Sequence, residues 1–351
     1  MTMRVGLIGC GDIGRVRASA VSQTPDARLT AVSDLDAKRA SGIASQFGAA
    51  VAPDWKSLVR REDVDVVIVS TPPSIHAEMC IEALGAGKHV MCEKPLARTP
   101  NECRRIIAAA ESAGRVLATG FNYRFYPSIL KAREILDSGL IGTLDHVRSY
   151  SGYSAAEHSH GWLHDVEVMG GGALRDNGIH LIDLTRYFLG EVAEVKGFAT
   201  ENVWNFKGCE DNGFALLRSM QGRVATVQAS WTEWRKYRFL IEIYGSRGCI
   251  RASCFPMITE VTWFASLGGR TNRKTHYFPM THLWEKLKSY RWVVAQSFVR
   301  EMQAMRRAIK GERTALADGL DGLRTVEIAH LAARGGGQIS LEPETARAVV
   351  A

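Results

Sequence analysis

Residues 4–14 read Arg4-Val-Gly-Leu-Ile-Gly-Cys-Gly-Asp-Ile-Gly14. A short apolar run, residues 4–8, leads directly into the pattern Gly-x-Gly-x-x-Gly at residues 9–14. The apolar run is typical of a buried parallel strand, and residues 12–22 continue with helical periodicity. In this setting the first glycine permits a tight turn, the second lets a pyrophosphate approach the backbone, and the third lets helix pack on strand. The free N–H groups of the helix then face the anion. The predicted cofactor contacts here are Gly9, Gly11, Asp12, Ile13 and Gly14.

Asp34 follows the second predicted strand, Arg28–Ser33, and lies 20 residues beyond Gly14. A carboxylate at this place accepts hydrogen bonds from the adenosine ribose hydroxyls. It also repels a 2′-phosphate, so the sequence favours NAD over NADP as the cofactor. Lys38 and Arg39 weaken that preference slightly, although we interpret them as solvated residues of the next helix.

Strands and helices alternate through the rest of the first third of the chain. Further strands are predicted at residues 65–70, 88–92 and 116–119, and helices at residues 36–47, 75–86 and 99–113. This alternation predicts an α/β domain with a doubly wound parallel sheet, whose ligands bind outside the carboxyl ends of the strands. The other predicted cofactor contacts lie at those ends: Ser70, Thr71, Pro72, His76, Glu93 and Lys94.

Lys94 follows the fourth strand and precedes Pro95, so we expect its ammonium to be held in place at the edge of the sheet. The positive nicotinamide ring would lower the pKa of this lysine, because a like charge disfavours the protonated form. There the lysine can hydrogen-bond a substrate oxygen and stabilise negative charge on it. The alternative is a structural lysine paired with Glu93 or another acid, and local features do not choose between the two.

A second glycine-rich stretch is Gly170-Gly-Gly-Ala-Leu-Arg-Asp-Asn-Gly-Ile-His-Leu-Ile-Asp183. Three consecutive glycines disfavour regular structure, whereas the apolar positions from Leu181 onward recur at helical spacing. Asp176 and His180 are four residues apart, so we predict that they share one face of the first helical turns. A carboxylate beside an imidazole suits proton transfer. Alone, such a pair more often serves packing, and the rest of the chain favours the catalytic interpretation.

Four motifs occur together in order: Gly9-x-Gly11-x-x-Gly14, Thr71–His76, Glu93-Lys94-Pro95 and Gly171-Gly-x-Leu-x-Asp176-x-Gly-x-His180. In this spacing the chain resembles, over nearly its whole length, the glucose-fructose oxidoreductase, inositol dehydrogenase and rhizopine catabolism (Gfo/Idh/MocA) family. The resemblance implies a Rossmann domain followed by an α/β domain with a large, open, mainly antiparallel sheet that usually makes the oligomer contacts. It also implies Lys94, Asp176 and His180 as the catalytic residues, and a cis peptide bond between Lys94 and Pro95.

The alternation of strands with helices ends near residue 122. We therefore predict an NAD-binding domain over residues 1–122 and an α+β domain over residues 123–351 that binds substrate and makes oligomer contacts. Strands are predicted at residues 143–150, 192–201, 212–220, 223–231, 238–244 and 249–252, and helices at residues 125–138, 284–310 and 318–333. The last helices pack back toward the first domain in the family. Strand 223–231 has one apolar face and one mixed face. Such an open sheet needs cover on both faces, which predicts a homodimer or homotetramer.

Residues 154–169 show no regular pattern but contain three closely spaced histidines and Trp162. No cysteine or carboxylate set completes a metal site there, so we predict no metal. We expect Trp162 to stack on a sugar ring and His160 to hydrogen-bond a hydroxyl. Arg124 and Asn177 complete the predicted substrate contacts.

Residues 268–288 are basic and irregular, and they are interpreted as a lid, an anion-binding loop or a solvated loop, whereas residues 334–351 are interpreted as a tail.

The composition of the 351 residues is that of an ordinary globular protein of two domains. Lys and Arg number 44 against 37 acidic residues, a net charge of +7, which suits an anionic substrate or simply a solvated basic surface. The basic residues are spread along the chain, which argues against nucleic acid. No apolar run has membrane-spanning length and no signal-peptide pattern is present, so we expect a cytoplasmic protein without a membrane partner. The seven cysteines lack metal or redox spacing and are interpreted as reduced thiols.

The main functional hypothesis is an NAD-dependent oxidoreductase that transfers a hydride between a secondary alcohol of a polyol, sugar or sugar derivative and nicotinamide C4. His180 would act as general base, Lys94 would polarise the oxygen, and Asp176 would orient His180 or bind the adjacent hydroxyl. The resemblance also admits an NAD-dependent glycosidase that oxidises its substrate transiently and returns the hydride without net NADH. A non-catalytic nucleotide sensor would leave these three residues without a role.

Overall fold

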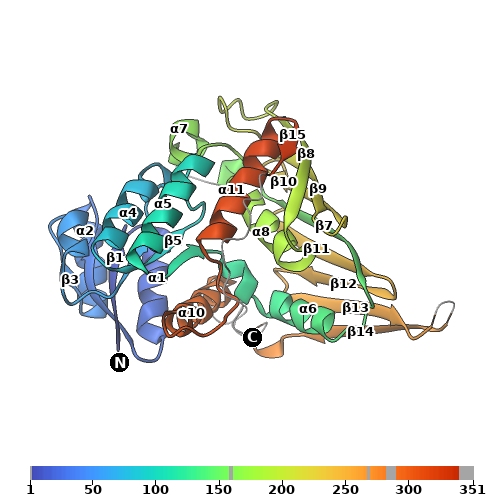
Figure 1. The fold of residues 1–351 in the computed structure, drawn as a ribbon, viewed down its shortest axis with the longest axis horizontal. Helices are drawn as coiled ribbons and strands as arrows, with labels where there is room; N and C mark the ends of the chain where they lie inside the picture. Colours follow the sequence, from blue (N-terminus) through green and yellow to red (C-terminus); the bar gives the residue numbers. More distant parts are fainter. Residues whose placement is uncertain (1, 158–160, 267–268, 282–289, 340–351) are drawn as a thin grey trace.

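The computed structural model contains two sheets that lie side by side with helices around and between them (Figure 1). It describes residues 2–157, 161–266, 269–281 and 290–339. The first sheet has six parallel strands in the order β3-β2-β1-β4-β5-β6, and the second has nine strands in the order β14-β13-β12-β11-β7-β10-β9-β8-β15. Only the β7–β10 pairing in the second sheet is parallel. The predicted fold class, a Rossmann domain plus a domain with a large, mainly antiparallel sheet, is confirmed.

The first sheet contains β1 (Met3–Ile8), β2 (Ala27–Ser33), β3 (Ala50–Val51), β4 (Val66–Val69), β5 (His89–Glu93) and β6 (Leu117–Gly120). Its helices are α1 (Asp12–Gln23), α2 (Ala37–Phe47), α3 (Trp55–Val59), η1 (Pro73–Ile75), α4 (His76–Gly85) and α5 (Pro100–Ala113). The sequence analysis missed β3 and α3, because elements this short do not display a period. The strand order reverses between β1 and β4, and ligands of such sheets bind at that switch point.

The second sheet contains β7 (Leu144–Gly152), β8 (Val192–Thr200), β9 (Asn212–Ser219), β10 (Val224–Ser230), β11 (Arg238–Gly245), β12 (Gly248–Ser253), β13 (Ile258–Phe264), β14 (Thr271–Tyr277) and β15 (Gly336–Gln338). Its longer helices are α6 (Pro127–Asp137), α8 (Gly178–Leu189), α10 (Tyr290–Ile309) and α11 (Gly319–Ala333). Short helical segments are η2 (Asn122–Phe125), η3 (Ala155–Glu157), η4 (Gly161–His164) and α7 (Val166–Met169).

Three segments predicted to be irregular contain regular structure. Residues 271–277 form the edge strand β14, which pairs with β13, and the prediction failed because this strand is polar on both faces. Gly336–Gln338 belongs to the predicted tail but pairs with β8 as strand β15. Residues 154–169 contain η3, η4 and α7, each too short to show helical periodicity.

The two faces of the large sheet differ in their cover. Ala225, Val227 and Ala229 of β10 are buried on the inner face, which contacts α8, whereas Val224 and Thr226 are exposed on the outer face. The alternation predicted for this strand is therefore confirmed. Figure 1 shows α11 between the two sheets, where it contacts α5 and β6 on one side and α8 and β8 on the other.

Helix α10, from the last part of the chain, packs on the Rossmann domain. Its buried side chains Phe298, Met302 and Met305 belong to the hydrophobic cluster that also contains Val5 of β1 and Val21 of α1. No helix within the described residues combines the length and the apolar content that crossing a bilayer would require.

Candidate active site

The glycine-rich loop after β1 has the shape of a dinucleotide cradle. A Cβ atom on Gly9, whose φ is +93°, would lie 2.3 Å from the carbonyl oxygen of Ser70 at the end of β4, and one on Gly14 would lie 2.0 Å from the oxygen of Gly9. A Cβ on Gly11 would meet nothing within 4 Å, so open space lies beside this backbone. Gly11 is also the N-cap of α1 and brings no side chain to cap the helix. These residues fit a bound pyrophosphate, which would accept from the first N–H groups of α1.

Asp34 lies at the carboxyl end of β2 and is held by two backbone donors. Its carboxylate accepts from the N–H of Cys10 (2.6 Å) and from the N–H of Asp36 (2.7 Å). The neighbouring cation Arg39 is 3.4 Å from the carboxylate of Asp36, which also caps α2. The fixed negative charge of Asp34 therefore lies beside the glycine loop, and the neighbouring Arg39 is paired with another acid.

Two of the predicted cofactor contacts make prominent contacts within the protein. The buried ring of His76 places Nδ1 3.0 Å from the oxygen of Pro95 and Nε2 2.8 Å from the oxygen of Thr71, so it ties together the loops after β4 and β5. Glu93 accepts from Arg17 Nε at 2.6 Å, and Arg17 in turn reaches Glu301 of α10. These contacts indicate that both side chains stabilise the loops around the cofactor site. Direct contact of either side chain with the cofactor stays a prediction.

Lys94 pairs with Asp176 rather than with Glu93. Its Nζ lies 3.2 Å from Oδ1 of Asp176 and 3.1 Å from the backbone oxygen of the same residue. The peptide bond from Lys94 to Pro95 is cis, as the family resemblance implied. The ammonium of the Rossmann domain thus meets the glycine-rich loop of the second domain at the carboxyl end of β5.

The second carboxylate oxygen of Asp176 accepts from the hydroxyl of Tyr153 and from Nε1 of Trp231, the latter at 3.2 Å. Tyr153 directly follows β7, and Trp231 directly follows β10. Because β7 and β10 are parallel neighbours in which Gly152 pairs with Ser230, the two side chains leave the sheet at the same edge. Sequence reasoning missed both residues, because the pairing of β7 with β10 that brings them together cannot be seen in the local sequence.

His180 lies in the first turn of α8 between aromatic rings. It stacks on Tyr123 with ring centroids 4.0 Å apart and an interplanar angle of 8°, and it meets the edge of Phe121. Burial, reinforced by the charge of Lys94 and opposed by that of Asp176, lowers the pKa of His180 well below its usual value. The imidazole is therefore neutral at pH 7 and able to accept a proton.

The predicted shared helix face of Asp176 and His180 is wrong, because α8 begins at Gly178, two residues after Asp176. Asp176 belongs to a turn in which the N–H of Gly178 donates to the oxygen of Ala173. A Cβ on Gly178 would lie 2.8 Å from the Cβ of Ala229, so a glycine here lets α8 approach β10 closely. The two side chains reach one site from different elements.

The glycine-rich loop is held by Glu210, another residue that sequence reasoning missed. The carboxylate of Glu210 accepts from the N–H groups of Gly172 and Leu174, both at 2.8 Å. A Cβ on Gly172 would lie 2.2 Å from the oxygen of Glu210, so close backbone approach explains this glycine. Burial raises the pKa of Glu210. The loop is a fixed turn, which keeps Asp176 in place.

The predicted substrate contacts are not all brought together. The buried guanidinium of Arg124 donates to Asp183 at 2.5 and 2.9 Å and lies 3.1 Å from Asp321, so we withdraw it from the substrate contacts. Asn177 is buried, donates to the oxygen of Ser151 at 3.1 Å, and has no partner for its Oδ1 within the described residues. Trp162 is exposed on η4, and His160 lies outside the described residues.

None of the described residues forms a group of three or more His, Cys, Asp or Glu side chains with an arrangement that could hold a metal ion. The seven cysteines are free thiols, and six of them are buried. Lys94, Asp176 and His180 bring an ammonium, a carboxylate and an imidazole to this site.

Comparisons with known proteins identify the family and the fold of the chain. The family described as "Oxidoreductase family, NAD-binding Rossmann fold" matches residues 3–121, and the Gfo/Idh/MocA C-terminal domain matches residues 129–251. The chain is 30% identical to inositol 2-dehydrogenase of Rhizobium meliloti over 95% of its own length and 97% of that protein. It is 30% identical to myo-inositol 2-dehydrogenase of Thermotoga maritima, covering 91% and 92% of the two chains. The fold matches that of levoglucosan dehydrogenase in complex with NADH, with a TM-score of 0.85, 24% identity, and 97% and 100% of the chains covered.

Proposed function

Because this chain belongs to the Gfo/Idh/MocA family of NAD-dependent oxidoreductases, we propose that it transfers a hydride between a secondary alcohol of a polyol or sugar and nicotinamide C4. The observation that carries this proposal is the meeting of Lys94 and Asp176, with the neutral imidazole of His180 close to both charges. Relatives named as inositol dehydrogenases support the choice of a polyol or sugar as substrate.

In the proposed mechanism each side chain has one task. Bound NAD⁺ supplies the hydride acceptor at nicotinamide C4. A ring nitrogen of His180 takes the hydroxyl proton, since burial keeps the imidazole neutral. Lys94 donates a hydrogen bond to the same oxygen and stabilises the negative charge that develops on it. Asp176 fixes the ammonium of Lys94 by accepting from its Nζ.

The assay that tests this function follows absorbance at 340 nm with NAD and a panel of inositols, aldoses, uronates and glycosides, with NADP in parallel. Uronates are included because the net charge of +7 suits an anionic substrate. We expect NADH to accumulate with one class of polyol or sugar. A glycoside that is cleaved without net NADH would instead indicate the hydride-returning glycosidase, and no turnover of any member would contradict the proposal.

The position of Asp34 predicts the cofactor preference. Replacing Asp34 by asparagine should lower the ratio of kcat/KM for NAD to that for NADP about 10- to 100-fold, because the variant no longer repels a 2′-phosphate. The amide oxygen can still accept from the N–H of Cys10, so the loop should keep its shape. The matched control is Glu111→Gln, which removes an exposed acid of α5. An unchanged ratio in Asp34→Asn, or an equal change in the control, would refute this role.

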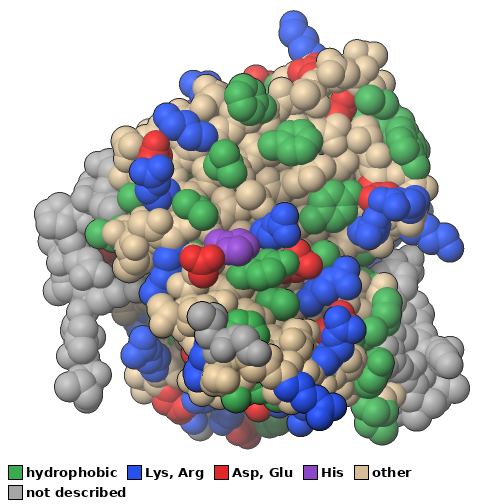
Figure 2. Space-filling model, turned by 90° about the vertical axis from the view of Figure 1, so that its right-hand side faces the viewer, with side chains coloured by type: hydrophobic (Ala, Val, Ile, Leu, Met, Phe, Trp, Pro, Cys, Tyr) green, Lys and Arg blue, Asp and Glu red, His purple; other side chains and the backbone are tan. Residues whose placement is uncertain are grey.

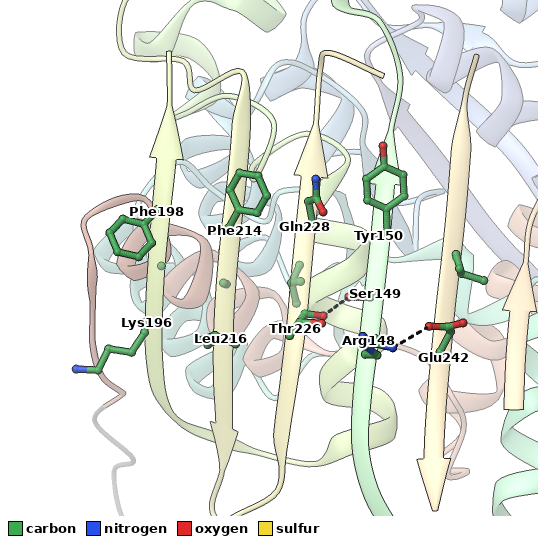
Figure 3. A pocket seen from close by; sticks show the side chains of 14 residues that line it. Arg148, Ser149, Tyr150, Lys196, Phe198, Phe214, Leu216, Thr226, Gln228 and Glu242 are labelled. Carbon is green, nitrogen blue, oxygen red and sulfur yellow. Dashed lines mark hydrogen bonds and ion pairs between the residues drawn. The ribbon is translucent and has the colours of Figure 1, made fainter. Parts of the chain in front are cut away.

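The outer face of the large sheet favours self-association, and we propose that it makes the homo-oligomer. Phe198, Phe214, Leu216 and Val224 are between 41% and 78% exposed on β8, β9 and β10. Figure 2 shows hydrophobic side chains among Lys and Arg on the side of the molecule that carries this sheet, and Figure 3 shows Phe198 and Phe214 projecting from their strands. A groove of about 370 Å³ lies on this face and is lined by residues of β7, β8, β9, β10 and β11. Exposed apolar patches of this kind mark interaction surfaces.

Replacing Leu216 by aspartate should therefore reduce the molar mass measured by light scattering from that of the oligomer to that of one chain. A charge in a closely packed apolar interface loses its hydration without a partner. Leu35→Asp is the control, because Leu35 is fully exposed on the Rossmann domain. A wild-type monomer, or a Leu216→Asp oligomer of unchanged mass, would contradict this surface.

A further inference from the structure

Tyr153 has no task in the mechanism proposed above, yet its side chain is aimed at the centre of the site. It is 5% exposed, and its hydroxyl donates to Oδ2 of Asp176. The backbone that carries it is fixed, because the N–H of Tyr153 donates to the oxygen of Ser230 at 3.1 Å. The phenol is thus placed by the sheet itself, at the edge where β7 and β10 end together.

The two oxygens of Asp176 face different partners. Oδ1 lies 3.2 Å from Nζ of Lys94, whereas Oδ2 accepts from Tyr153 and from Nε1 of Trp231. Two donors reach Oδ2 from different directions, which limits rotation of the carboxylate and leaves Oδ1 facing the lysine. A lysine side chain has several rotatable bonds, so the fixed carboxylate, together with the backbone oxygen of Asp176 at 3.1 Å, decides where its ammonium lies.

Tyr153 remains a donor at neutral pH. Burial, together with the charge of Asp176, raises the pKa of Tyr153 above its usual value. Its ring is buried beside Trp231, which is 0% exposed, so water has little access to replace the phenol. Hydrogen bonds from neutral donors to a buried carboxylate are among the stronger ones in proteins.

We infer that Tyr153 is a positioning residue, which holds Asp176 so that Oδ1 presents the ammonium of Lys94 to the substrate oxygen. This inference rests on the proposed function, because it assigns Tyr153 to the same hydride-transfer site. The inference gives the two residues different tasks. Asp176 orients the ammonium of Lys94, and Tyr153 orients the carboxylate of Asp176.

The test compares Tyr153→Phe with wild-type enzyme on the alcohol that the substrate panel identifies. We expect kcat to fall about 10- to 100-fold, which corresponds to one hydrogen bond to a charged group. The KM for the alcohol and the Kd for NADH should stay within about twofold, because Tyr153 contacts neither in this account. Tyr150→Phe is the matched control, since Tyr150 lies in β7 three residues before Tyr153 and its hydroxyl donates to Glu233 instead.

A double-mutant cycle with Asp176→Asn separates positioning from a general structural role. If Tyr153 acts through the Asp176 carboxylate, Tyr153→Phe should change kcat by no more than about twofold in the Asp176→Asn background. An equal loss in both backgrounds, an unchanged kcat in the single variant, or a loss explained by weaker NADH binding or a lower melting temperature would overturn the inference. A wild type that turns over no member of the panel would overturn the proposed function and this inference together, whereas an active wild type with a normal Tyr153→Phe variant would overturn the inference alone.

Discussion

Replacing His180 by alanine is expected to lower kcat for alcohol oxidation about 10²- to 10⁴-fold, the usual contribution of a general base. The imidazole is buried against Tyr123 and Phe121, and alanine leaves no group at that position to accept the proton. The Kd for NADH, measured by fluorescence, should change little. His146→Ala is the control, because His146 is partly exposed and stacks on Tyr244 in the large sheet. A variant that retains most of its rate would remove His180 from the mechanism.

The lowered pKa of His180 also predicts how the rate of oxidation should change with pH. Because burial and the charge of Lys94 lower the pKa of His180, the imidazole stays neutral as the pH falls below the usual value of 6.5. The kcat/KM for oxidation should therefore decline only below pH 6.5, as His180 becomes protonated. An acidic limb centred at or above pH 6.5 in the His180-dependent activity would contradict the proposed environment of the base.

Replacing Lys94 by alanine is expected to lower kcat about 10²- to 10³-fold, the range for removing a donor that stabilises a developing oxyanion. The loss should be larger than that of Tyr153→Phe, because Lys94 is the group that contacts the substrate oxygen and Tyr153 acts on it through Asp176. NADH binding should persist, since the glycine loop and Asp34 are untouched. Lys56→Ala is the control, because the side chain of Lys56 on α3 is exposed.

A Lys94→Ala variant with a near-normal rate would show that the lysine is structural, which is the alternative that its local sequence left open. A loss of NADH binding that accounts for the whole loss of rate would contradict the oxyanion role as well.

The parts of the fold that the sequence predicts are those governed by local patterns. The turn around Gly9 to Gly14 and the buried strands of the Rossmann sheet depend on short-range periodicity and on the absence of a Cβ atom, and both can be recognised from neighbouring residues. Strand β14 was not recognised, because an edge strand exposed on both faces has no apolar alternation.

The site was predicted less completely because its contacts join distant residues. Lys94 and Asp176 are 82 positions apart, and the family resemblance, rather than the local sequence, implied that both belong to the catalytic site. Tyr153 and Trp231 reach Asp176 across 23 and 55 positions, and only the parallel register of β7 and β10 brings them together. The sequence does not show whether an aromatic residue at a strand end only packs or also donates a hydrogen bond.

Arg124 illustrates the opposite error. An arginine after a strand end of a nucleotide-binding sheet is a reasonable substrate contact, but here Asp183, 59 positions later, takes its guanidinium. Asp183 lies on the buried side of α8, one turn beyond His180, and α11 adds Asp321 to the same arginine. The pairing depends on how helices pack, which residue type alone does not specify.

The most direct test of the central claim follows one hydrogen atom. The enzyme is incubated with NAD⁺ and the alcohol that the panel identifies, deuterated at the carbinol carbon, and both the cofactor and the product are analysed by mass spectrometry. Hydride transfer to nicotinamide C4 predicts reduced cofactor that carries one deuterium, together with an equal amount of ketone. Unlabelled cofactor, or deuterium that returns entirely to a cleaved sugar product, would contradict net dehydrogenation.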